Sequence, residues 1–274
     1  KCRAQESRVF FEGKGYLYGI EGTFYVSECE ECGLWFQNPR PPLHHVADLY
    51  PEDYSPHNQS LPLESRMPIA ARRTGYLRRH LGYSDVKPVD QWRFDWTSAL
   101  PIWFWNWYFG VKLIPHYVPD GKLLEIGCAS GAQLSFFRYL GWEHLHGIEL
   151  IPKAAKAAQQ LGFSVKCGPV ESVIGNYPDG YFDVVYSTMV LEHLHNPFRV
   201  VRLVAQKLKP GGCFLFSTVV RDSLDVRIYG RLSRCFDLPR HLVYFEKADI
   251  YEMLEPQFNN IQCFHQAAPQ DFTW

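Results

Sequence analysis

LLEIGCASGAQL, residues Leu123–Leu134, is the most informative segment of this chain. It reads as a buried strand over 122–126, a loop that contains Gly127 and Gly131, and an amphipathic helix from about residue 132. Glycines at a strand-to-helix turn let a ligand approach the backbone, and the start of the helix offers unpaired N–H donors. The next strand-like run, HLHGIEL, carries an acid, Glu149, placed to bind ribose hydroxyls. The segment therefore predicts a site for a nucleoside cofactor.

The glycine spacing indicates which cofactor this is. A dinucleotide site would carry G-x-G-x-x-G, whereas Gly127 and Gly131 form G-x-x-x-G. Glu125 stands two residues before the first glycine, where its carboxylate would repel a pyrophosphate but could accept a hydrogen bond from an ammonium group. That combination favours a nucleoside that bears an amino acid, namely S-adenosylmethionine.

Four motifs follow one another in the order typical of a known family. They are EIGCASG, GIEL, YFDVVYSTMVLEHLHNP (Tyr181–Pro197) and LKPGGCFLFST (Leu208–Thr218). Over roughly 119–260 the chain resembles the class I S-adenosylmethionine-dependent methyltransferases. The resemblance implies an α/β, Rossmann-like, doubly wound and mostly parallel seven-stranded sheet within a domain over 119–274. Six strands are expected at 122–126, 144–149, 164–167, 182–187, 212–218 and 260–265, and the seventh is expected to lie beyond Trp274.

The same resemblance implies a set of cofactor contacts at the strand ends. Glu125 and the glycine-loop backbone would hold the methionine part, Glu149 the ribose, and the later residues the adenine and the amino-acid group. Glu171 can also be read as an acid that favours a helix start. The full set is Glu125, Gly127, Cys128, Ala129, Gly131, Glu149, Leu150, Val170, Glu171, Ser187 and Thr188.

Methyl transfer is an in-line displacement, and an oxygen or carbon acceptor must also lose a proton. His241 in DLPRHLVYF is the first candidate for the catalytic base, His193 in LEHLHNP is the second, and a mechanism without a protein base is the third. Oxygen acceptors are favoured over carbon. Arg240 could bind an acidic group of the acceptor or form an ion pair on the surface. No Asp/His cluster in the sequence suggests a catalytic metal.

Residues 1–42 differ in character and predict a small β module with runs at 8–11, 16–20 and 23–27. The knuckle CEECG presents Cys29 and Cys32 to one zinc ion, and Cys2 lies upstream at the spacing of the other half of a zinc ribbon. The fourth cysteine would precede Cys2, so the ribbon is expected to be truncated. A redox pair and metal-free thiols are the alternatives. A ribbon followed by NPRP, YPEDY and a methyltransferase domain resembles a bacterial group that acts on sugars, glycans or small metabolites.

Residues 43–118 are interpreted as a connector and a helical lid. An arginine-rich helical pattern covers 65–82, and 100–115 reads LPIWFWNWYFGVKLIP. This aromatic run could contact a membrane surface peripherally, line the acceptor pocket as a lid, or simply pack on the sheet. It is too short and too polar to span a bilayer.

Composition narrows the function further. The chain has 274 residues, 46% of them hydrophobic, and a formal net charge of −1. This near-neutral charge argues against nucleic acid as a partner, and eight scattered cysteines favour free thiols in a reducing cytoplasm. We therefore predict a methyltransferase for a small-molecule or glycan-type acceptor. The alternatives are an RNA or protein methyltransferase recruited by the zinc module, and a non-catalytic scaffold; neither the acceptor nor the oligomeric state has a recognisable signature.

Overall fold

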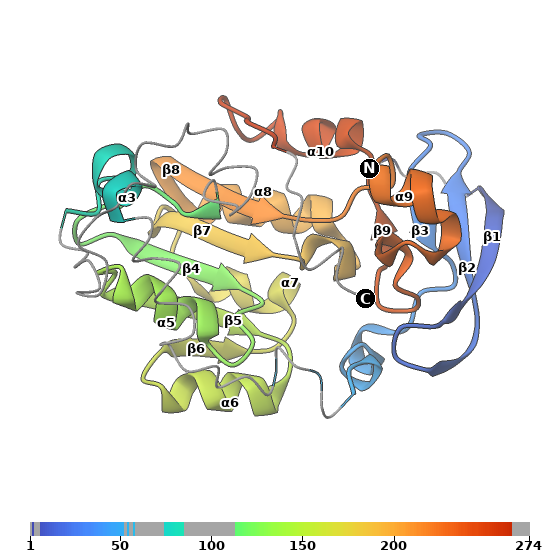
Figure 1. The fold of residues 1–274 in the computed structure, drawn as a ribbon, viewed down its shortest axis with the longest axis horizontal. Helices are drawn as coiled ribbons and strands as arrows, with labels where there is room; N and C mark the ends of the chain where they lie inside the picture. The colour runs from blue at the N-terminus through green and yellow to red at the C-terminus, as the bar shows by residue number, and fades with distance from the viewer. Residues whose placement is uncertain are drawn as a thin grey trace.

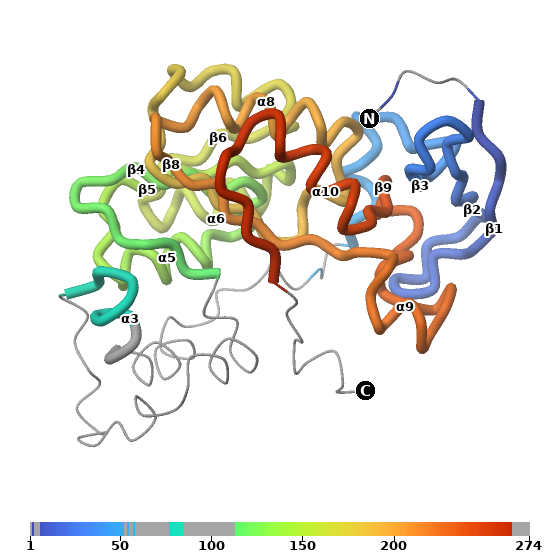
Figure 2. The backbone as a smooth tube through the Cα atoms, turned by 90° about the horizontal axis from the view of Figure 1, so that it is seen from above, coloured from blue at the N-terminus to red at the C-terminus, as the bar shows by residue number. Residues whose placement is uncertain are grey.

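The computed structural model describes residues 2, 6–51, 54, 57, 74–84 and 113–264. These residues form two sheets, one of five strands and one of four. Figure 1 shows the larger sheet with helices on both faces and the smaller sheet beside it. Seen from above, the smaller sheet and helix α9 (Leu224–Tyr229) lie at one end of the larger sheet (Figure 2). The expected lid or membrane contact over 100–115 falls mainly on 100–112, which lie outside the described residues.

The larger sheet is parallel throughout and has the order β6-β5-β4-β7-β8. Its strands are β4 (Lys122–Ile126), β5 (His144–Glu149), β6 (Ser164–Cys167), β7 (Phe182–Thr188) and β8 (Leu208–Ser217). All five occur where the sequence predicted them, and β8 begins four residues earlier. The expected strand over 260–265 is wrong for 260–264, which have no regular structure, while residue 265 is not described. The described part of the chain thus contains five of the seven expected strands.

Helices cover both faces of this sheet because its strands carry apolar side chains on both sides. Alternate residues of β4 point in opposite directions: Leu123 joins the cluster with α5, α6 and α3, whereas Leu124 joins the cluster with α7, α8 and α10. The helices are α3 (Thr74–Leu81), α5 (Ala132–Tyr139), α6 (Pro152–Gln160), α7 (Val170–Val173), α8 (Pro197–Lys207), α9 (Leu224–Tyr229) and α10 (Lys247–Leu254). This is the predicted doubly wound arrangement.

Short 3₁₀ turns connect these elements. They are η1 (Leu43–His45), η2 (Ala47–Leu49), η5 (Ile174–Asn176), η6 (Leu191–His193), η7 (Gly230–Leu232) and η8 (Arg234–Phe236). Of the predicted arginine-rich helix over 65–82, α3 covers 74–81, and residues 65–73 are not described. Within the described residues, no helix combines the length and the apolar character that crossing a bilayer would require.

The smaller sheet is antiparallel and pairs three strands from the first 37 residues with a short strand at residues 243–244. Its strands are β1 (Ser7–Gly15), β2 (Ile20–Cys29), β3 (Trp35–Gln37) and β9 (Val243–Tyr244), in that order. The expected strand over 16–20 is wrong, because residues 16–19 form the turn between β1 and β2. Strand β9 follows β8 by way of α9 and pairs with Trp35 and Phe36. The smaller sheet therefore contains a strand from the methyltransferase-like part of the chain.

Candidate active site

The loop after β4 has a backbone that few residues other than glycine adopt. Gly127 and Gly131 have φ values of +74° and +84°, and Ala129 between them has a φ of +46°. The N–H groups of Gly127 and Cys128 donate to the carbonyl oxygen of Ile148, at 2.8 and 3.2 Å. A Cβ on Gly127 would lie 2.5 Å from the Cγ2 atom of a neighbouring valine, Val190. The loop therefore holds its shape through β5 and leaves no room for a side chain at Gly127.

Glu149, at the end of β5, also holds this loop in place through a hydrogen bond to its carboxylate. One carboxylate oxygen accepts a hydrogen bond from the N–H of Ala129 and the other from the N–H of Ile151, both at 2.8 Å. Burial raises the pKa of the Glu149 carboxyl, although these backbone donors oppose the shift. Each oxygen can accept further bonds. The predicted ribose ligand therefore also sets the geometry of the glycine loop.

The predicted cofactor contacts divide into two groups. Those that line the cavity at the strand ends are Gly127, Ala129, Glu149, Leu150, Val170, Glu171 and Thr188. The remaining four lie behind its wall: Glu125, Cys128, Gly131 and Ser187. Ser187 donates its hydroxyl to the carbonyl oxygen of Ile126 at 3.4 Å. Cys128 packs beneath Gly147, and burial raises the pKa of its thiol. A buried thiol with a raised pKa does not serve as a nucleophile, so Cys128 contributes to the packing of the loop.

The cavity has a volume of 2290 Å³ and continues from the glycine loop towards the smaller sheet. This is larger than a pocket for one drug-sized ligand, about 300–1,000 Å³, so cofactor and acceptor can occupy it together. Its far wall comes from the β1–β2 turn and the segment after β3, and it contains Leu17, Tyr18, Leu43, Val46, Tyr50, Tyr54 and His57. The sequence did not predict this wall: YPEDY, which contains Tyr50 and Tyr54, indicated only a family resemblance, and the run over 16–20 was expected to be a strand.

Three tyrosine rings of this wall surround Arg240. The rings of Tyr18, Tyr54 and Tyr50 have centroids 3.9, 5.0 and 5.4 Å from the guanidinium carbon. Arg240 also pairs with Asp237, and both side chains are 4% exposed. The ion pair considered from sequence therefore exists, but it is buried at the cavity rather than at the surface. It fixes the guanidinium against the aromatic wall.

The two candidate catalytic histidines lie in contact. The ring centroids of His193, in η6, and His241 are 4.6 Å apart, and both residues line the cavity. His193 places its Nδ1 atom 3.0 Å from the carbonyl oxygen of Arg240, and His241 places Nδ1 2.8 Å from that of Cys235. Because a carbonyl oxygen can only accept, both Nδ1 atoms must donate, which leaves Nε2 of each ring for other partners. Burial lowers the pKa of His193 well below its usual range.

A buried carboxylate lies beside these rings. Glu192 is fully buried, and its Oε2 atom accepts a hydrogen bond from the Thr218 hydroxyl at 2.7 Å. Its Oε1 atom is 4.0 Å from Nε2 of His193. Glu192, His193 and His241 each place one possible metal-ligand atom, a carboxylate oxygen or a ring nitrogen, within 4.8 Å of the other two. The sequence showed no cluster of acidic residues and histidines because the fold brings His241 to Glu192 and His193 from a distant segment.

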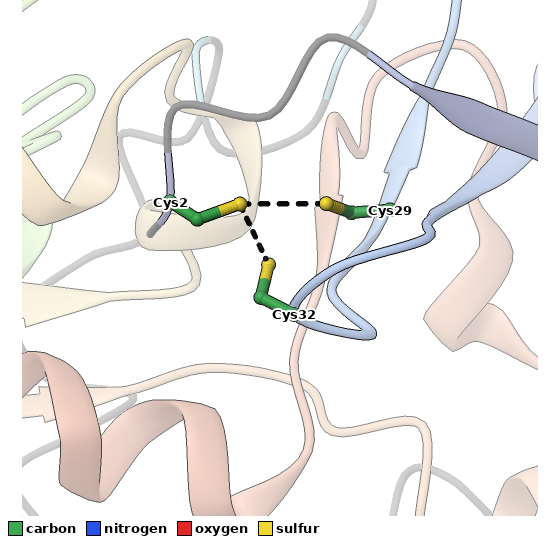
Figure 3. A group of neighbouring side chains, drawn as sticks. All are labelled: Cys2, Cys29 and Cys32. Carbon is green, nitrogen blue, oxygen red and sulfur yellow. Dashed lines mark hydrogen bonds between the residues drawn. The ribbon is translucent and has the colours of Figure 1, made fainter.

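The three predicted zinc ligands also converge (Figure 3). The sulfur of Cys2 lies 3.4 Å from that of Cys29 and 3.3 Å from that of Cys32. Thiolates about 2.3 Å from a tetrahedral zinc ion would lie about 3.8 Å apart, so a small relaxation would admit the metal. Burial raises the pKa of the Cys29 thiol, but backbone hydrogen bonds at Cys32 and Glu31 and side-chain hydrogen bonds from Cys2 and Cys32 together lower it, whereas burial raises the pKa of Cys32. Among the described residues, no fourth cysteine or histidine joins this group.

Comparison with known proteins gives a consistent assignment. A profile of the family described as "Methyltransferase domain" matches residues 111–261. A ubiquinone biosynthesis O-methyltransferase from Chromobacterium violaceum is 34% identical over 108 residues, which cover 37% of this chain and 46% of that protein. One from Albidiferax ferrireducens is 35% identical over 121 residues, which cover 41% of this chain and 47% of that protein. The chain thus spans about half the length of the curated relatives it matches.

Solved structures include similar chains as well. An S-adenosylmethionine-dependent methyltransferase from Mesorhizobium loti matches with a TM-score of 0.35 and 26% identity, over 37% of this chain and 47% of that one. A possible histamine N-methyltransferase from Thermotoga maritima matches with a TM-score of 0.43 and 21% identity, over 51% of this chain and 64% of that one.

Proposed function

The chain belongs to the methyltransferase domain family, and on that premise we propose that it moves a methyl group from S-adenosylmethionine to an oxygen of a small-molecule or glycan-type acceptor. The observation that carries the proposal is the cavity itself. It begins at the glycine loop and Glu149 and ends at two histidines and an aromatic wall. The names of the curated relatives, which specify O-methylation of a small molecule, support the choice of acceptor atom.

The cofactor would lie across the ends of β4 and β5. The half-buried backbone of Gly127 and Ala129, which lines the cavity, would face its methionine part, and Glu149 would accept hydrogen bonds from its ribose hydroxyls. Leu150, Val170 and the other predicted cofactor contacts that line the cavity would surround the adenine and the amino-acid group. S-Adenosylmethionine supplies a methyl group on a sulfonium, which needs no activation by the protein. The task of the chain is to align the acceptor and to exclude water.

The acceptor would lie between the cofactor and the tyrosine wall. Tyr18, Tyr50 and Tyr54 offer flat apolar faces with hydroxyl groups at their edges, which suits a sugar ring or an aromatic ring with polar substituents. We propose His193 and His241 as the catalytic residues, since their Nε2 atoms are the groups available to activate an acceptor hydroxyl, either directly or through an ion that they hold. The acceptor oxygen bonds to the methyl carbon as the carbon–sulfur bond breaks. The products are a methyl ether, S-adenosylhomocysteine and a proton.

We further propose that Cys2, Cys29 and Cys32 hold a structural zinc ion. Their thiols converge, and the backbone donors at Cys29 favour its thiolate. The ion would connect the segment before β1 to the knuckle after β2 and so stabilise the smaller sheet, which supplies part of the aromatic wall. Its place is structural rather than catalytic, because none of the three cysteines lines the cavity.

Calorimetric titration of S-adenosylhomocysteine tests the proposed function. Wild type should bind it with micromolar affinity, and Glu149→Gln should weaken binding, because the neutral amide accepts ribose and loop hydrogen bonds less well. Glu143→Gln is the matched control, since this glutamate is exposed and not part of the cavity. Circular dichroism establishes that each variant is folded. A folded wild type that binds neither S-adenosylmethionine nor S-adenosylhomocysteine would contradict the proposal.

A further inference from the structure

The cluster of Glu192, His193 and His241 has the composition of a metal centre. One carboxylate oxygen and one nitrogen from each imidazole lie within 4.8 Å of one another. Two histidines and one carboxylate form a common protein ligand set for divalent first-row metals such as zinc and iron. We propose that these three residues bind a divalent first-row metal ion that activates the acceptor.

The surroundings orient all three groups for coordination. Each imidazole donates its Nδ1 proton to a backbone carbonyl oxygen, that of Arg240 or of Cys235, so Nε2 carries a lone pair. Such a hydrogen bond on the second ring nitrogen is the usual arrangement of metal-binding histidines, because it fixes the tautomer and the ring orientation. Thr218 holds Oε2 of Glu192 in the same way. These hydrogen bonds fix the orientation of both rings and of the carboxylate, and the three groups must move slightly closer to hold one ion, because Nε2 of His193 now lies 4.0 Å from Oε1 of Glu192.

Burial supplies a second argument. Glu192 is fully buried, and within the described residues its Oε1 atom has no hydrogen-bond partner. An unsatisfied carboxylate oxygen in the protein interior is costly, and a cation that coordinates it removes that cost. Nε2 of His193 lies 4.0 Å from this Oε1 atom. An ion between them would satisfy both atoms.

The position of the cluster gives the ion a chemical role. His193 and His241 line the cavity, whereas Glu192 lies behind them, so the ion would have its remaining coordination positions on the cavity side. An acceptor hydroxyl that binds there has its pKa lowered and loses its proton to water. Its oxygen then attacks the methyl carbon, the carbon–sulfur bond breaks, and S-adenosylhomocysteine leaves. This role rests on the proposed methyl transfer, whereas binding of the ion does not.

The proposal is tested with Co²⁺ added alone to the untagged, chelator-treated full chain. Cobalt at the cysteine cluster should give an intense thiolate charge-transfer band, and cobalt at the histidine cluster should give only weaker visible bands. Cys29→Ser should lose the thiolate band and keep the visible bands. His241→Gln should keep the thiolate band and bind cobalt at the other site at least about 100-fold more weakly, because even loss of an outer partner costs 10–100-fold. His45→Gln, at an exposed histidine, should change neither.

Two outcomes would overturn the inference. One is a folded Cys29→Ser protein that binds no cobalt, and this result does not depend on how His241→Gln folds. The other is His241→Gln with the cobalt affinity and visible spectrum of wild type. S-Adenosylhomocysteine titrations on the same samples separate the two proposals. Its binding should persist in metal-free wild type and in His241→Gln, so loss of cobalt binding alone leaves the proposed cofactor intact.

Discussion

Gly127→Ala should destabilise the protein through two separable effects. The positive φ costs an alanine about 1–2 kcal/mol of unfolding free energy. The added methyl would lie 2.5 Å from Cγ2 of Val190, and such overpacking costs about 1–3 kcal/mol more. Gly162→Ala is the matched control, since Gly162 has a φ of +87° but nothing within 4 Å of its added Cβ. Urea unfolding of cofactor-free protein should show a loss about 1–3 kcal/mol greater for Gly127→Ala.

A double-mutant cycle isolates the contact with Val190. Val190→Ala removes Cγ2 and leaves only Cβ, at 3.7 Å from the new methyl. In that background Gly127→Ala should cost only the backbone part, so the coupling energy should be about 1–3 kcal/mol. Equal losses in Gly127→Ala and Gly162→Ala, or a coupling energy near zero, would refute the argument that the glycine loop is shaped by packing against Val190.

Three further predictions concern single side chains. Cys29→Ser should reduce the zinc content of the purified protein and lower its melting temperature in a thermal scan. Asp183→Asn should lower the unfolding free energy at neutral pH by about 1 kcal/mol, because burial raises the pKa of this carboxyl but hydrogen bonds from Lys209 and from the N–H of Lys122, with the charges of both lysines, together lower it. A lowered pKa stabilises the fold above the usual value of 3.8, so urea titrations of the two proteins should converge as pH falls below it. Asn196→Ala should cost about 1 kcal/mol in the same assay, since Asn196 caps α8 by accepting from the N–H of Arg199 at 3.0 Å.

The parallel sheet could be predicted from sequence because local patterns determine it. Strand β4, for example, is a short apolar run with a helical period after it. The glycines at 127 and 131 also indicate the positive φ angles of the loop that follows β4. The three cysteines were also predictable, since the knuckle brings Cys29 and Cys32 together within a few residues. In these cases the residues that form the structure lie close together in the sequence, or, as for Cys2, their spacing is typical of a known motif.

The cluster beside the cofactor loop could not be predicted in the same way. Glu192 and His193 are adjacent, but His241 reaches them only because the segment after β8 folds back, with the N–H of Leu242 donating to the carbonyl oxygen of Glu192 at 2.7 Å. Similarly, β9 has only two residues and shows no period. Such contacts depend on tertiary pairing, so a pattern of residue types does not reveal them.

Strand β9 also bears on how the protein is made. The edge that Trp35 and Phe36 present on β3 is completed by residues 243–244, near the other end of the sequence. During synthesis, β3 leaves the ribosome long before β9, its partner on that edge, so the hydrogen-bonding groups of this edge stay unpaired until β9 has been made. Early release of the nascent chain would expose an open sheet edge, which is a site of aggregation. A chaperone that shields this edge should therefore raise the yield of native protein more than one that acts on the finished chain.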